Sequence, residues 1–509
     1  MTGFSKISSL FLLYIILILF PSGIIYSQLV NDFRVNDDST NQTQYSAKSG
    51  IDGQGNFVLT WTDEKKNGRS NIYCQQFNSS GGFLGANFKV NINPDSSALP
   101  DIAVANNGNF AVCWLDVNND GLTILTKVKC RIFDYNGIPL TGEIILNDTL
   151  GRVVTTPSIG ISNDNEFTIS WSQKDILYQK IDSSGNKIGS NQKVNDDIGS
   201  YTQDYPAITV RRDGSFIITW NDTRPPGMVH ADDIYMQMYD KSGNTVGVNQ
   251  KVNDDLVNTN LQIAPKISSD STGNFVITWS DNRLDNSHGE VFAQRYNNSG
   301  IKTGQNFRVT NSSLQFGKGV AGINMKPNGD FIIGWSEFRP NIPQCYFQRY
   351  NNTGSQIGIN YLVSDQSLNT DKYFSDLKIY DDKIISIWSD RRNGPFDVYC
   401  NIRSFTNPDT TVNIIQTSSL VPESFSLYQN YPNPFNSSTQ IRFDISQNNI
   451  YKLEIYNNLG QKIKEVFNKF LTTGSYNINF ESGNISSGVY QYILSSPKER
   501  YVKSFVLLK

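Results

Sequence analysis

The stretch GNFVITW, residues 273–279, decides the fold, because six other stretches of the chain resemble it. Each ends in one of the chain's seven tryptophans: Trp61, Trp114, Trp171, Trp220, Trp279, Trp335 and Trp388. Successive tryptophans lie 49 to 59 residues apart. β-Branched and aromatic residues fill the positions before each tryptophan, which is typical of a strand. A repeat of this length with several strands predicts a propeller blade, and hence an all-β fold with a seven-bladed β-propeller.

Each repeat contains four predicted strands. A short apolar stretch, often opened by proline, precedes the tryptophan strand, and we expect it to lie innermost. A strand such as IYCQQF (residues 72–77) follows, then a glycine turn and a last strand such as QKVN (residues 192–195). Cys74, Cys130 and Cys400 occupy equivalent positions in their repeats, so we expect buried thiols rather than disulfides.

The seventh repeat lacks its fourth strand after Val398–Arg403. The missing piece stands before the first repeat, where FRVNDD at Phe33–Asp38 matches QKVNDD at residues 192–197 and 250–255. We therefore expect this N-terminal strand to complete the seventh blade, so that residues 28–405 form one closed domain. The alternative, an open β-solenoid, would not need this offset.

The segments before and after the propeller have different compositions. Residues 1–27 carry a signal-peptide pattern, because Lys6 precedes the apolar run LFLLYIILILF and small and polar residues follow it. An uncleaved membrane anchor is the alternative. Residues 406–422 are rich in Thr, Ser, Asn and Pro, which indicates a linker. The net charge is −3 with no basic stripe, so nucleic acid is not an expected partner.

Residues 423–509 contain about seven short predicted strands, which indicates a small Ig-like β-sandwich. Four motifs occur there in order: LYQNYPNPFN (427–436), IYNNLGQKI (455–463), SSGVYQYIL (486–494) and KSFVLLK (503–509). Together they resemble the type A C-terminal sorting domain of the type IX secretion system. One departure is Ser437, which stands where the family usually has proline after PFN.

The resemblance carries functional implications for the whole chain. It implies that the type IX machinery is a partner and that the protein is secreted, or attached to the surface of a Gram-negative cell. The family's sorting motif falls on Asn430, Tyr431, Pro432, Asn433, Pro434 and Phe435.

An acid and an arginine follow several tryptophans at constant spacing: Asp222 and Arg224, Asp281 and Arg283, Glu337 and Arg339, Asp390 and Arg392. The acid could cap turn amides while the arginine pairs with the acid that opens the next strand, at Asp233, Glu290 or Asp397. We favour this structural interpretation because the pattern recurs in nearly every repeat. The alternative is a ring of acids and arginines around a ligand.

The only two histidines, His230 and His288, fall in equivalent loops of adjacent repeats. A shared metal or acid–base site is one interpretation, and two solvated loop side chains are the other. Three acidic pairs could bind Ca²⁺ or start turns: Asp37 with Asp38, Asp196 with Asp197, and Asp254 with Asp255. We predict no catalytic residue, no bound metal and no cofactor.

The function that these patterns favour is binding. We expect an exported monomer whose propeller binds a protein or glycan through the loops that follow the tryptophans, with Asp222, Arg224, His230, Asp281, Arg283, His288, Asp390 and Arg392 as candidate residues. The alternative is a secreted hydrolase of the glycosidase type, which would need two facing carboxyl groups roughly 5–9.5 Å apart.

Overall fold

The computed structural model describes most of the chain from residue 28 onward. The described ranges are 28–37, 42–64, 69–92, 96–119, 124–148, 157–199, 201–224, 232–255, 260–284, 289–310, 316–339, 342–364, 370–406, 415–418, 422–447, 449–471, 473–482, 485–496 and 498–508. The predicted signal peptide lies outside these residues.

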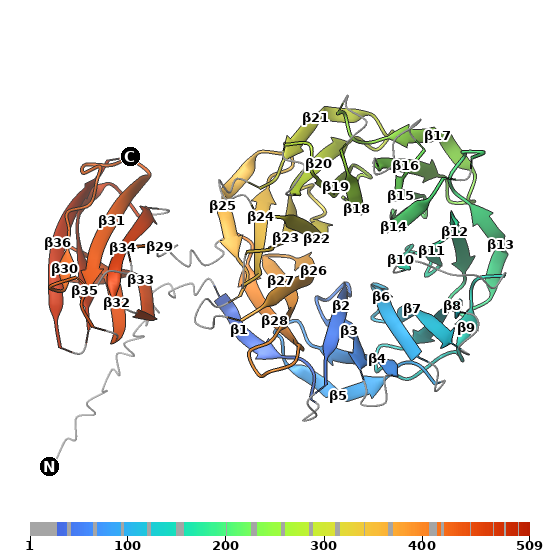
Figure 1. The fold of residues 1–509 in the computed structure, drawn as a ribbon, viewed down its shortest axis with the longest axis horizontal. Helices are drawn as coiled ribbons and strands as arrows, with labels where there is room; N and C mark the ends of the chain where they lie inside the picture. The colour runs from blue at the N-terminus through green and yellow to red at the C-terminus, as the bar shows by residue number, and fades with distance from the viewer. Residues whose placement is uncertain are drawn as a thin grey trace, which may run out of the picture.

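Seven four-stranded sheets surround one axis, which confirms the seven-bladed propeller (Figure 1). Blade 1 has β2 (Gln44–Ile51), β3 (Phe57–Glu64), β4 (Ser70–Phe77) and β5 (Phe83–Lys89); blade 2 has β6 (Ser96–Val104), β7 (Phe110–Asn119), β8 (Ile124–Phe133) and β9 (Ile144–Ile145); blade 3 has β10 (Ser158–Ile161), β11 (Phe167–Gln173), β12 (Asp175–Ile181) and β13 (Lys187–Lys193); blade 4 has β14 (Gln203–Val210), β15 (Phe216–Asp222), β16 (Asp233–Tyr239) and β17 (Thr245–Lys251). Blade 5 has β18 (Gln262–Ser269), β19 (Phe275–Asp281), β20 (Glu290–Tyr296) and β21 (Lys302–Arg308); blade 6 has β22 (Lys318–Met325), β23 (Phe331–Glu337), β24 (Gln344–Tyr350) and β25 (Gln356–Leu362); blade 7 has β26 (Lys372–Tyr380), β27 (Lys383–Asp390), β28 (Asp397–Ser404) and β1 (Gln28–Arg34). In each blade the strand that precedes the tryptophan strand lies nearest the axis, as predicted (Figure 1).

Strand β1 closes the ring by pairing antiparallel with β28. The pairing extends past the strand, where the amide of Val35 donates to the carbonyl of Val398 at 2.8 Å. The amide of Val398 donates in turn to Asn36 Oδ1 at 2.9 Å. Blade 1 has the same bond, from the amide of Ile72 to Asn91 Oδ1 at 2.9 Å. The N-terminal strand therefore takes the fourth-strand position with the contacts of a regular repeat, and the predicted closure is confirmed.

One tryptophan occupies the core between each pair of neighbouring blades. All seven indoles are at most 1% exposed. The buried apolar side chains of the propeller form seven clusters, and each cluster contains a single tryptophan. Trp279 of blade 5, for example, packs with Ile217 and Met236 of blade 4. The repeated tryptophan is therefore the residue that joins blade to blade.

Pro157 stands directly before β10, at the start of its strand as expected, but the other three prolines lie inside the innermost strands. Pro100, Pro206 and Pro265 each follow a residue with positive φ: Leu99 (56°), Tyr205 (53°) and Ala264 (54°). The strand pairing shifts register at each of these points. Proline lacks an N–H and is tolerated at such bulges, because the ladder is already interrupted there. Each bulge lies near the start of its strand.

All five cysteines are buried free thiols, as expected for those at equivalent repeat positions. Burial raises the pKa of Cys74 and of Cys130 to about 12, so these thiols stay protonated at neutral pH.

The C-terminal sandwich consists of two four-stranded sheets. One contains β29 (Ile415–Ser418), β30 (Ser426–Leu427), β31 (Ser438–Ile445) and β34 (Gly474–Glu481); the other contains β32 (Asn449–Asn457), β33 (Lys462–Leu471), β35 (Gly488–Ser495) and β36 (Arg500–Leu507). β29 pairs with β34, so a segment that we expected in the linker takes part in the sandwich. The sandwich has its own apolar core, which includes Phe435, Tyr451 and Tyr492.

Deleting residues 28–37 from the mature chain should destabilise the propeller by at least about 3 kcal/mol, because it removes the β1–β28 ladder and the buried side chain of Val35. All tryptophans lie in the propeller, so their fluorescence during urea unfolding reports this domain alone. Asp37→Ala, at the exposed end of the segment, serves as the control and should leave the midpoint unchanged. An unaltered midpoint in the deletion variant would contradict the closure.

Replacing Trp279 with Ala should lower the free energy of unfolding by about 3–5 kcal/mol, the usual cost of removing a large buried side chain. The control is Ile301→Ala, at an exposed turn, which should change stability by less than about 0.5 kcal/mol. The same fluorescence measurement compares the two variants. A stable Trp279→Ala variant would show that the tryptophans do not hold the blades together.

Candidate functional site

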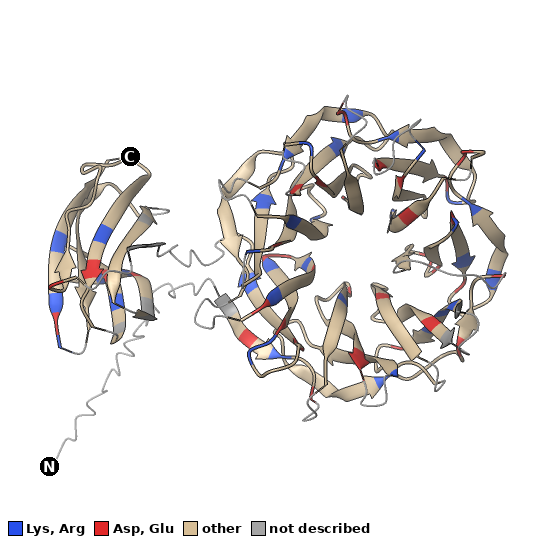
Figure 2. Cartoon of the chain, viewed as in Figure 1, with Lys and Arg blue, Asp and Glu red and all other residues tan. Residues whose placement is uncertain are grey.

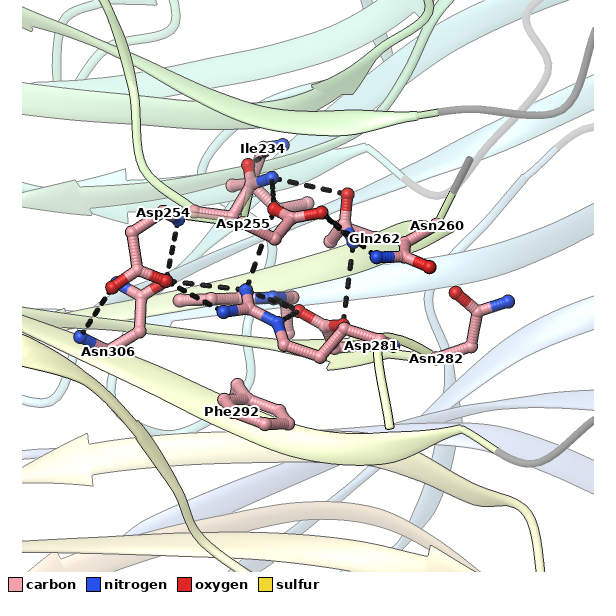
Figure 3. Close-up of polar contacts among 12 residues, drawn as sticks. Ile234, Asp254, Asp255, Asn260, Gln262, Asp281, Asn282, Phe292 and Asn306 are labelled. Carbon is pink, nitrogen blue, oxygen red and sulfur yellow. Dashed lines mark hydrogen bonds and ion pairs between the residues drawn. The ribbon is translucent and has the colours of Figure 1, made fainter. Parts of the chain in front are cut away.

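The acid–arginine motif forms a buried cluster in blade 5 (Figure 3). Asp281, the last residue of β19, is 1% exposed. Its Oδ2 accepts hydrogen bonds from Trp279 Nε1 at 2.8 Å and from Arg283 Nε at 2.9 Å. The guanidinium of Arg283 also pairs with Asp254 at 2.7 Å and lies 4.5 Å from the centre of the Phe292 ring. We call this acid–arginine–acid arrangement the arginine clamp.

Blades 4 and 7 contain the same clamp. It joins Asp222, Arg224 and Asp196 in blade 4, and Asp390, Arg392 and Asp32 in blade 7. Burial tends to raise the pKa of Asp390, but the hydrogen bonds and charge of Arg392 hold it below its usual value. In blades 4 and 5 the second carboxylate of the clamp, Asp196 or Asp254, lies in the segment that connects the preceding blade to this one. The clamp therefore fixes that connection to the loop after the tryptophan strand.

The arginine does not pair with the acid that opens the next strand, so this expectation is wrong. Asp233 pairs with Lys251 at 2.7 Å, Glu290 pairs with Lys318 at 3.0 Å, and Asp397 accepts from Asn36 Nδ2 at 2.8 Å. The guanidinium groups of Arg224, Arg283 and Arg392 pair instead with Asp196, Asp254 and Asp32, which are not part of the acid–arginine motif.

The structure describes only some of the other residues that the sequence singled out. His230 and His288 lie outside the described residues. Of the acidic pairs, Asp196 and Asp254 belong to clamps. Their neighbours Asp197 and Asp255 lie 3.9 and 3.8 Å from the same arginines, and Asp197 also accepts from Asn195 Nδ2 at 2.6 Å. Among the residues that the structure describes, no group of three or more His, Cys, Asp or Glu side chains is placed to hold a metal ion.

Three aromatic side chains lie close together on blades 6 and 7, on the face that carries the clamps. Phe338 follows β23, Tyr373 lies near the start of β26, and Phe396 precedes β28. Ring centres are 6.2 Å apart for Phe338 and Tyr373, and 5.4 Å apart for Tyr373 and Phe396. Phe338 is 46% and Tyr373 is 37% exposed, and Arg391 lies over the Phe396 ring at 4.5 Å. We call these three residues the aromatic row.

The aromatic row departs from the repeat. Counted by strand register, the residues equivalent to Phe396 in other blades are Ser70, Thr126, Lys174, Asp232, Gly289 and Pro343. A feature that every blade shares is explained by the fold, whereas one confined to two neighbouring blades is not. The sequence analysis missed the row, although a comparison of equivalent positions across the repeats would have found it.

Two carboxylates form a second departure, in blade 4. Asp204 lies near the start of β14 and Asp232 directly precedes β16. Burial and then the charge of Asp204 raise the pKa of Asp232. Asn221 Nδ2 donates to Asp232 at 3.4 Å, while the buried Asn221 Oδ1 has no hydrogen-bond partner among the described residues. Beside Asp204, the 46% exposed Tyr205 takes the left-handed backbone conformation of the bulge. We call Asp204 and Asp232 the carboxylate pair.

The sorting motif of the sandwich holds the last strand in place. Asn430 is buried and its Nδ2 donates to Thr439 Oγ1 at 2.9 Å. The amide of Val506 donates to Asn433 Oδ1 at 2.8 Å, and the amide of Phe435 donates to the carbonyl of Val506 at 3.1 Å. Phe435 fills the core, whereas Tyr431 is exposed. Tyr431–Pro432 and Asn433–Pro434 are cis peptide bonds. The motif therefore connects β36 to the opposite sheet.

The chain has distant likenesses among solved structures. The polysaccharide lyase Uly1 is 10% identical over 74% of this chain and all of its own, with a TM-score of 0.49. A protein of unknown function from Dyadobacter fermentans is 11% identical over 74% of this chain and 98% of its own, with a TM-score of 0.46. The GH93 α-L-arabinofuranosidase of Fusarium graminearum is 9% identical over the same shares, with a TM-score of 0.45. No curated protein matches the sequence.

The C-terminal domain has a direct family match. Residues 429–508 match the secretion system C-terminal sorting domain, which includes the motif that holds β36. In the part of the chain that the structure describes, no helix is both long and apolar enough to cross a membrane. The segment thus belongs to the sorting domains of the type IX secretion system, and the protein is a β-propeller that this system exports to the surface or exterior of a Gram-negative cell.

Proposed function

We propose that the exported propeller binds an extracellular glycan at the aromatic row. The observation that carries this proposal is the exposure of Phe338 and Tyr373 in rings spaced for contact. Blade 1 has a tyrosine, Tyr45, at the position of Tyr373, but only blades 6 and 7 combine this tyrosine with two neighbouring phenylalanines. Sugar rings present an apolar face of C–H groups, which packs on an exposed aromatic ring. Arg391 and Asp371, paired at 3.6 Å beside Phe396, supply polar groups for hydroxyls.

The clamp residues serve this proposal indirectly. Asp222, Asp281 and Asp390 are at most 1% exposed, and each already binds an arginine and a tryptophan. We therefore assign them to the support of the loops on this face rather than to ligand contact.

Glycan-array screening of the mature chain, residues 28–509, should identify a ligand. Tyr373→Ala should then weaken binding about two- to tenfold, because an aromatic contact contributes about 0.5–1.5 kcal/mol. The matched control is Tyr135→Ala, which removes an exposed tyrosine from a turn between β8 and β9. Equal affinities of the two variants for the array ligand would refute the aromatic row as the site.

A second candidate function is glycoside hydrolysis at the carboxylate pair. Asp232 has the raised pKa that a general acid needs, and Asp204 is the nearby second carboxylate. Neither is bound to an arginine, unlike the predicted acids of the clamps. Acid–base chemistry is therefore favoured at the carboxylate pair rather than at the acids of the clamps.

If the pair is catalytic, the mature chain should release reducing ends from the glycans that it binds, and Asp232→Asn should lower the rate about 10²–10⁴-fold. Activity that depends on protonated Asp232 is lost as the pH rises through its raised pKa. Asp213→Asn, an exposed turn acid, is the control. Hydrolysis that survives Asp232→Asn would exclude the carboxylate pair as the catalytic residues. Binding without any hydrolysis would support glycan binding as the only function of the propeller.

A further inference from the structure

The innermost strands place one residue each at the same level of the propeller axis. Strand register defines this level, because in every blade the residue pairs with the one that precedes the tryptophan. The seven residues are Lys48, Asp101, Ser158, Ala207, Lys266, Gly322 and Asp376. We call them the axial ring. Figure 2 shows charged positions of both signs on the strands nearest the centre.

The two acids of the axial ring already have partners. Asp376 Oδ2 accepts from the Ser49 amide at 3.0 Å and from the Ser49 hydroxyl at 2.8 Å, and pairs with Lys378 at 3.2 Å. Asp101 accepts from the backbone amides of Ile102 and Ile159, both at 3.0 Å. Both carboxylates therefore already have hydrogen-bond partners within the protein.

The two lysines of the axial ring are poorly satisfied. Lys48 Nζ makes one long bond of 3.5 Å, to the carbonyl of Ser375. Lys266 makes no hydrogen bond or ion pair with any described residue. Both side chains are only half-buried, so solvent reaches them. An ammonium group at such a site gains from any acceptor that enters.

These charges face one another although they come from separate blades. Burial and the charge of Lys48 lower the pKa of Lys266 to about 8, while Asp101 and Asp376 oppose this shift. Lys48, Asp376 and Lys378 likewise affect the pKa of Asp101. Interactions across the axis require that the charged ends lie near the centre. The remaining ring positions are Ser158, Ala207 and Gly322, whose small size leaves room for the long lysines.

We propose that the axial ring binds a carboxylate or another small oxyanion between Lys48 and Lys266. Counting Lys378, three ammonium groups face two carboxylates, so the cluster lacks one negative charge. A bound oxyanion supplies that charge and the missing acceptors for both lysines. The carboxylate could be part of a uronic acid or a free small anion, because both present the same two oxygens. The site does not depend on the aromatic row or on the carboxylate pair.

The proposal fixes the sign of the pH dependence. Lys266 must be protonated to hold an anion, so binding is full below pH 7 and is lost as the pH rises through about 8. The charged groups that face Lys266 are Lys48 on β2, Asp101 on β6 and Asp376 on β26. Burial raises the pKa of Asp101, so this carboxyl is a second titrating group of the axial ring. Asp101→Asn separates the two titrations.

Isothermal titration of the mature chain with sodium sulfate, glucuronate and neutral glucose tests the site. We expect both anions to bind at pH 6.5 and glucose not to bind. Lys266→Met and Lys48→Met should each weaken anion binding about tenfold or more, and Asp101→Asn should strengthen it, because one competing negative charge is gone. Lys187→Met removes an equal charge from the outer strand β13 and should have no effect.

The outcomes are distinguishable. Binding of sulfate and glucuronate alike assigns a free-oxyanion site, and binding of glucuronate alone assigns a uronic-acid site. The proposal is overturned if neither anion binds, if glucose binds equally well, or if Lys266→Met keeps the wild-type affinity. Should Lys266→Met fail to fold, the opposite effects of Lys48→Met and Asp101→Asn still decide the question.

Discussion

The packing of one tryptophan between each pair of blades is the interaction on which the propeller depends. The blades are sheets arranged around one axis, and each sheet buries its two faces only against the two neighbouring blades. The indole also sets the surface chemistry: in blades 4, 5 and 7 its N–H donates to the aspartate two residues later, at 2.9, 2.8 and 3.2 Å. That aspartate holds an arginine, and the arginine holds a third carboxylate. The buried tryptophan of these blades is thereby linked, through the aspartate and the arginine, to the loops on the clamp face of the propeller.

Much of the fold could be predicted from the sequence because it is repeated. Seven tryptophans in seven similar strands define the blades, and the displaced FRVN segment at residues 33–36 reveals the closure, since Asn36 makes the bond that Asn91 makes in blade 1. The second partner of each arginine could not be predicted. Arg283 reaches Asp254, which is 29 residues away in the chain and belongs to another part of the repeat. Only the register of the strands places them together.

The aromatic row and the carboxylate pair were not predicted from the sequence, because they depart from the repeat. Phe338, Tyr373 and Phe396 belong to two blades, and no local motif connects them. A search for recurring residues selects the clamps, which serve the fold, and passes over positions that differ. The bulges of the innermost strands were hidden similarly, because Leu99, Tyr205 and Ala264 have no sequence preference for positive φ.

Unsatisfied charge lies where the repeat is broken, whereas the backbone strain is part of the repeat. Tyr205 has a positive φ, and so do Ser46, Leu99 and Ala264 at the equivalent positions of other blades. Lys266, in contrast, lies on an innermost strand and makes no hydrogen bond or ion pair with any described residue, although a small apolar residue, Ala207, stands at the same level of blade 4. This lysine is not needed to close a ring that the tryptophans and β1 already hold. The oxyanion site that we propose gives its ammonium group an acceptor.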